Sequence, residues 1–323
     1  MPSGGFAGST FGDQIERVYR NVMSNQREFT ANLSVDYSYG GTTLTMTGSQ
    51  AQSIQIGSIL AVDEEVFLVQ AVSVTTATIP VYTVTVTPGY EGSTNANHAS
   101  GTTVYINPKY TRWAIAVALN DALAAMSAPG MGLMREGYTT ITFNPVLRGY
   151  SLKDAGVPED FHSILSLSYD LPDPTHYFPV MRSFRVGRGI MNSKINGGYA
   201  LFLNSSAMPG LPMQVAYGAP FFPAVSTTQF MDSTVNADLM AGCGLPSTAL
   251  DIPAIRAEID LTLVREIKRN FTDSQPDMRK GTEVVAGNVM NSVSGLEMLY
   301  QKRMDEEANR FRNRWPQLKP IGI

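Results

Sequence analysis

The sequence predicts an α+β protein: a helical bundle formed by N-terminal, central and C-terminal helices, with two inserted antiparallel β-regions. The spacing of apolar residues switches between helical period and strand alternation, in the order α, β, α, β, α, α. The 323 residues are enough for roughly two domains. The predicted helical core domain comprises residues 1–41, 108–137 and 247–323, an inserted small β-barrel or sandwich module spans 42–107, and a second β-rich region spans 138–246.

Helices are predicted where apolar residues recur at three- and four-residue spacing. Thr10 is placed to cap the first helix, in which Ile15 and Val18 share one face. The central helix runs over 110–126 and is rich in alanine, which allows close approach of a neighbour. Two helices follow in the last quarter of the chain, the second from about residue 288 to 314.

The first β-region contains short alternating segments separated by turns. Asp63 to Glu65 forms a predicted hairpin turn, which we expect to be solvated rather than to bind a cation. A glycine-rich loop at 88–101 precedes the last strand, 103–106. In the second β-region, the strand candidates lie at 139–143, 163–169, 199–203 and 213–217.

The composition excludes several classes of protein. Charged residues make up 16% of the chain, against about 25% in typical domains, and the net charge of −4 leaves no whole-domain basic footprint for nucleic acid. Cys243 is the only cysteine, which excludes an intramolecular disulfide and a cysteine zinc site. No signal peptide and no apolar run of roughly 18 residues is visible, so we expect no membrane association.

The residues that carry chemistry show no catalytic pattern. His98, His162 and His176 have no histidine or cysteine at metal-ligand spacing, and each is expected to be a loop histidine bonded to the backbone. Cys243 has no partner signature for a nucleophile and is expected to be a free loop thiol. Nucleotide-binding glycine motifs are absent. The sequence therefore predicts no enzyme activity, no cofactor and no metal.

One basic cluster lies outside the helices, in the stretch from residue 182 to 194. Its alternation of arginine with apolar residues is compatible with contact to DNA phosphates. A strand with a charged outer face, or an ion pair between subunits, explains the same pattern. The residues of this cluster are Arg182, Arg185, Arg188 and Lys194.

Several segments resemble head-to-tail connector (neck adaptor) proteins of tailed bacteriophages. The glycine-rich loop Pro88–Gly101, after the strand pair at Ile54–Val69, is similar to β-modules of phage neck and tail proteins. The segments Ile15–Arg20, Val264–Asn270 and Leu296–Ala308 are similar to the helices of the adaptors. The resemblance covers most of the chain as a pattern.

This resemblance implies a structural virion protein without an active site. It would form a homo-oligomeric ring, usually a dodecamer, between the portal protein and the tail or neck proteins, and packaged double-stranded DNA would pass through its lumen without sequence specificity. The implied location is the virion neck, and the host cytoplasm during assembly. The large second β-region leaves a tail tube or hub role open. A receptor-binding tail protein is a further alternative, disfavoured because Trp113 and Trp315 fall on predicted helices.

Overall fold

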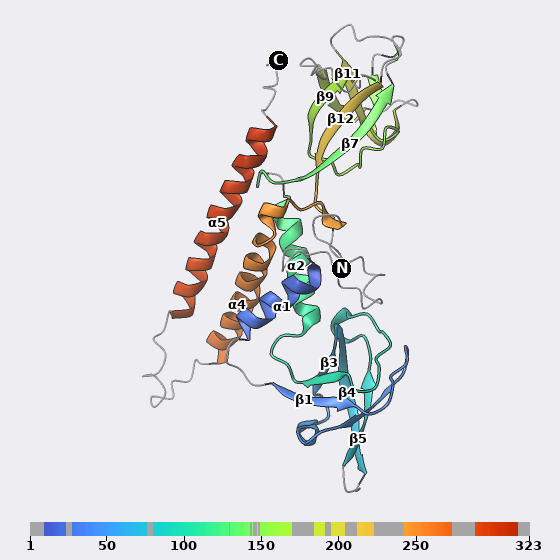
Figure 1. Ribbon diagram of the computed structural model, residues 1–323, viewed down its shortest axis with the longest axis vertical. Helices are drawn as coiled ribbons and strands as arrows, with labels where there is room; N and C mark the ends of the chain where they lie inside the picture. The colour runs from blue at the N-terminus through green and yellow to red at the C-terminus, as the bar shows by residue number, and fades with distance from the viewer. Residues whose placement is uncertain are drawn as a thin grey trace, which may run out of the picture. The chain divides into compact units, whose positions relative to one another are not determined.

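The computed structural model shows a chain of four helices and twelve strands within the residues that it describes (Figure 1). The described residues are 10–23, 28–75, 80–128, 130–142, 144, 147, 149–169, 184–190, 195–203, 212–222, 242–272 and 288–315.

The predicted helical bundle is wrong. Strands make up 35% and helices 34% of the structure, and six strands form a closed antiparallel barrel. The error has a physical reason: an apolar stripe shows that a helix packs against something, but not that it packs against other helices. Helices and strands contribute equally to this fold, and the strands are not inserts in a helical frame.

The barrel closes in the order β1-β2-β5-β4-β3-β6, and β6 pairs again with β1. It begins at Phe29, within the stretch that the sequence assigned to the helical core. Its strands are β1 (Phe29–Leu33), β2 (Thr43–Thr47), β3 (Ile59–Val62), β4 (Glu65–Thr75), β5 (Val81–Thr87) and β6 (Thr103–Ile106).

Alternation along the strands explains why the barrel closes around an apolar interior. In β5, Val84 and Val86 are buried whereas Thr85 and Thr87 are exposed, as expected when successive side chains point to opposite faces. Phe67 of β4 is fully buried in the same cluster. The inside of the barrel is therefore a packed core.

The helices lie where the apolar spacing predicted them. They are α1 (Phe11–Val22), α2 (Arg112–Met126), α4 (Ile252–Thr272) and α5 (Asn288–Arg314). Thr10 caps α1 as predicted, through a capping box with Asp13, and Ile15 and Val18 are buried. Asn21 of α1 donates to Glu258 of α4 at 2.7 Å. Of the helices in the described ranges, none combines the length and apolar composition that crossing a membrane requires.

The second β-region forms two three-stranded antiparallel sheets that share one apolar cluster. One has the order β10-β11-β8 and the other β7-β12-β9. Their strands are β7 (Arg135–Thr142), β8 (Gly149–Ser151), β9 (Ser163–Tyr169), β10 (Phe184–Arg188), β11 (Tyr199–Leu203) and β12 (Pro212–Ala219).

Two compact units result from this organisation. The first consists of Met1–Leu123, Pro223–Gly242 and Pro246–Gln301 and contains the barrel. The second consists of Ala124–Phe222, Cys243–Leu245 and Lys302–Ile323 and contains both three-stranded sheets.

Candidate functional site

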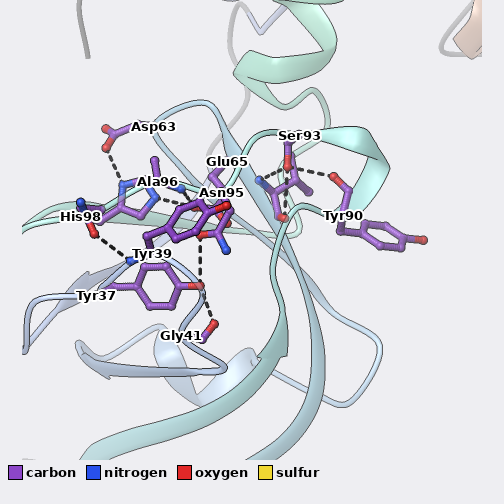
Figure 2. A network of polar contacts seen from close by, with 12 residues as sticks. Tyr37, Tyr39, Gly41, Asp63, Glu65, Tyr90, Ser93, Asn95, Ala96 and His98 are labelled. Atoms are coloured by element: carbon purple, nitrogen blue, oxygen red, sulfur yellow. Dashed lines mark hydrogen bonds and ion pairs between the residues drawn. The ribbon is translucent and has the colours of Figure 1, made fainter. Parts of the chain in front are cut away.

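A buried polar network ties the glycine-rich loop to the barrel (Figure 2). His98 of the loop lies between two carboxylates, those of Asp63 and Glu65 at the turn between β3 and β4. Its Nδ1 is 3.0 Å from Asp63 Oδ2, and its Nε2 is 2.9 Å from Glu65 Oε2. The backbones of His98 and Tyr37 also bond reciprocally, at 2.8 and 2.9 Å. We call His98, Asp63 and Glu65 the histidine clamp.

Electrostatics keep His98 protonated in this position. Burial lowers the pKa of the imidazole, but the hydrogen bonds and negative charges of Asp63 and Glu65 outweigh burial and raise that pKa to about 9. At neutral pH the ring is therefore an imidazolium that donates a hydrogen bond to each carboxylate. Neither nitrogen is available to act as a base.

Glu65 is the most deeply buried charge of the clamp. Its side chain is fully buried, whereas that of Asp63 is 49% exposed. Glu65 Oε2 also accepts from the backbone N–H of Ala96 at 2.9 Å, while Oε1 has no hydrogen-bond partner among the described residues. His98 thus supplies the charge that compensates a carboxylate held away from water.

Aromatic rings enclose the clamp on the barrel side. The Tyr37 ring lies 5.9 Å from the His98 ring and 5.2 Å from Phe67, measured between centroids. The Tyr37 hydroxyl donates to the carbonyl of Gly41 at 2.5 Å. Burial, together with the charge of Glu65, raises the pKa of Tyr37 to about 12. The enclosure leaves His98 5% exposed.

A second contact holds the beginning of the loop. The Ser93 hydroxyl accepts from the backbone N–H of Val66 at 2.9 Å and donates to the carbonyl of Tyr90 at 2.9 Å. Ser93 is itself buried. The loop is therefore bonded to β4 at Ser93, Ala96 and His98, which fixes its path across the barrel.

The clamp corrects two sequence predictions. The turn at Asp63 to Glu65 was expected to be solvated, but Glu65 is buried. His98 was expected to bond to backbone, yet its ring bonds to side chains. The expected bond from a histidine ring to the backbone is confirmed for His162, whose Nε2 is 2.6 Å from the carbonyl of Ser127. His176 lies outside the described residues.

The predicted basic cluster is described only in part. Arg185 and Arg188 lie on β10, and both are exposed, whereas Arg182 and Lys194 lie outside the described residues. Arg188 donates to the carbonyl of His162 at 3.0 Å, and its guanidinium lies 5.9 Å from the Phe161 ring centroid. The structure therefore places two of the four residues on one strand, and one of those two has an internal partner.

The cysteine and the possible metal ligands are the remaining chemistry-bearing groups of the described residues. Cys243 is fully buried and forms no disulfide. In the part of the chain that the structure describes, no group of three His, Cys, Asp or Glu residues is arranged to hold a metal ion. The histidine clamp is an ion pair of one imidazolium with two carboxylates.

Comparisons with known proteins do not assign the chain. No protein-family model matches it, and no curated protein matches it. Among solved structures, the flagellar hook junction protein FlgK from Burkholderia pseudomallei aligns with 83% of this chain at 11% identity and a TM-score of 0.13. The alignment spans 58% of that protein's length. A TM-score this low carries no argument about fold or function.

Proposed function

We propose that the protein is a structural subunit of a tailed-phage particle, a ring-forming head-to-tail adaptor that joins the portal to the tail around the DNA channel. The observation that supports this best is the histidine clamp. It uses one buried and one half-exposed carboxylate of the barrel to hold the loop 88–101, a segment that resembles the glycine-rich loop of phage β-modules. A loop held in one conformation binds a partner without the entropic cost of ordering.

The partners in this proposal are further copies of the chain, the portal protein, and tail or neck proteins. Packaged DNA is a partner without sequence specificity, and Arg185 is the described candidate for a phosphate or inter-subunit contact. No catalytic step is part of the proposal. A closed ring of identical subunits repeats one heterologous interface until it returns to the first copy.

Mass measurement and negative-stain imaging of the purified protein test the proposal. A ring with a central hole is expected, and antibodies against the protein should label the head–tail junction of the particle. Label along the tail or at its tip would favour the tube, hub or receptor-binding alternatives instead. A protein that is strictly monomeric and missing from the particle would contradict the proposal.

A further inference from the structure

Strand β4 continues past the barrel as an open edge. It pairs with β3 only from Glu65 to Leu68, but with β5 as far as Thr75. From Gln70 to Thr75, β4 therefore has β5 on one side and no strand of the described chain on the other. Figure 1 shows the β4–β5 hairpin extending beyond the other barrel strands.

The bonding of β5 shows which way its backbone groups point. The N–H of Val86 donates to Thr42 at 2.8 Å, on the β2 side. Because these groups alternate along an antiparallel strand, Val84 also faces β2, whereas Thr85 and Thr83 face β4.

The free backbone groups of β4 follow from this alternation. Ala71, Ser73 and Thr75 each pair with a residue of β5 whose backbone groups face β4. The N–H and C=O groups of Val72 and Val74 therefore point away from β5, toward the open edge. Their outward groups have no hydrogen-bond partner within the described residues.

Both residues with outward backbone groups, Val72 and Val74, have apolar side chains. Val72 packs partly against the barrel core, and Val74, on the same face, is 51% exposed. The sequence has no charged residue from Val66 to Tyr90. Proteins usually protect an exposed strand edge with charges, a proline or a bulge. Here the register shift lies at the start of the open segment, between Val69 and Ala71, and the residues from Val72 to Thr75 continue in regular register with β5 without charge or proline.

We propose that the open edge of β4 pairs with the same edge of a second copy of this chain. The two strands run antiparallel, with a two-fold axis at Ser73. Val72 then exchanges both backbone hydrogen bonds with the partner's Val74, and Val74 does the same with the partner's Val72. The pairing joins the two hairpins into one continuous four-stranded ribbon.

The edge itself argues for a second copy as the occupant. Free groups on two residues at i and i+2 are self-complementary in an antiparallel register. Two identical edges approach without repulsion because neither carries a charge. The valine side chains of both copies lie on one face of the ribbon, where β-branched cross-strand pairs are favourable.

This inference is independent of the proposed function. A two-fold contact is isologous, whereas a ring uses one heterologous contact. The β4 dimer is therefore proposed for the free protein, before it assembles into a ring. The contact is small compared with standard stable interfaces. The dimer is therefore weak and dependent on protein concentration.

Disulfide trapping tests the register. Ser73 opposite the partner's Ser73 is a non-hydrogen-bonded pair, with Cα atoms about 4.5 Å apart, a separation that a disulfide can span. The variant Ser73→Cys is expected to form a covalent dimer on mild oxidation, seen on a non-reducing gel. The matched control is Thr85→Cys, exposed on the same face of a strand whose two edges are both bonded. The native Cys243 is buried and does not contribute.

Sedimentation across a concentration series tests the affinity. Wild type should shift from monomer to dimer, and Val74→Lys should weaken the association about tenfold or more by placing like charges across the edge, whereas Thr85→Lys should not. Circular dichroism confirms that the variants fold. If Ser73→Cys cross-links no better than Thr85→Cys, or Val74→Lys leaves the association unchanged, the inference is overturned. A ring that persists in Val74→Lys with no Ser73→Cys dimer would overturn it and leave the proposed function standing.

Discussion

The barrel and the two three-stranded sheets protect their strand edges in different ways. The barrel bonds its strands into a closed cycle and leaves an uncharged stretch of β4 without a second strand neighbour among the described residues. The sheets are open, and β10, at the edge of one of them, carries the exposed Arg185 and Arg188. Charged edge strands discourage pairing with other chains. The comparison teaches that charge protects the β10 edge but not the open edge of β4.

The two regions also use histidine differently. In the barrel, His98 is a charged group between two carboxylates. In the second unit, the ring of His162 lies within hydrogen-bond distance of a backbone carbonyl, that of Ser127. The stability of each region should therefore respond differently to the loss of its histidine and to pH.

The largest expected effect is that of His98→Leu. It leaves the buried charge of Glu65 uncompensated and should lower the free energy of unfolding by about 3–5 kcal/mol. The matched control is His162→Leu, which removes the hydrogen bond between the ring and the carbonyl of Ser127 and should cost about 1 kcal/mol. Urea unfolding followed by circular dichroism measures both. Equal losses in the two variants would show that the clamp is no stronger than an ordinary hydrogen bond.

The pH dependence of the free energy of unfolding also tests the contribution of His98. The pKa of His98 is raised from 6.5 to about 9, so its contribution is complete below pH 6.5 and is lost as the pH rises through 9. Over this window, wild type should lose about 3 kcal/mol of stability relative to His98→Leu. Asp63→Asn keeps the fold and should lower the pKa of His98, which NMR titration of the ring would detect. An unchanged difference between wild type and His98→Leu from pH 6 to 9.5 would contradict the clamp.

The smallest expected effect concerns the charged edge of β10. Arg185→Ala should change the free energy of unfolding by less than about 0.5 kcal/mol, because the side chain is exposed. Arg188→Ala should cost about 1 kcal/mol, because Arg188 bonds to the carbonyl of His162. If Arg185 contacts a DNA phosphate, its loss should reduce the slope of the logarithm of the DNA-binding constant against the logarithm of the salt concentration by about one. A wild-type protein without measurable DNA binding would leave edge protection as the role of Arg185.

Local structure was largely predictable from the sequence, and its assembly was not. The alternation in residues 82–87 and the cap at Thr10 report short-range geometry, and both predictions are confirmed. The helical bundle was wrong because apolar periodicity does not identify what an element packs against. Strand β8 was missed because it is short and contains glycine, which weakens the strand pattern, whereas β10 was only one of the explanations offered for the basic cluster.

The histidine clamp was hidden by distance along the chain. Asp63 and Glu65 lie 35 and 33 residues before His98, so no spacing motif connects them. One signal was present in β4, where Glu65, Phe67 and Val69 occupy alternate positions and are all buried. A carboxylate in phase with two core residues indicates an inward-facing charge, and such a charge requires a cation nearby. That argument predicts that a partner exists, and only the fold identifies it as His98.

The filled interior of the barrel has a consequence for transport. Leu60, Phe67 and Val84 occupy the space that the strands enclose, so no thread of polymer and no column of water passes along the barrel axis. Any conduit that this protein helps to build must therefore be bounded by the outer surfaces of several copies. Its width would depend on how many copies meet, and widening or narrowing it would not require any strand of the barrel to move.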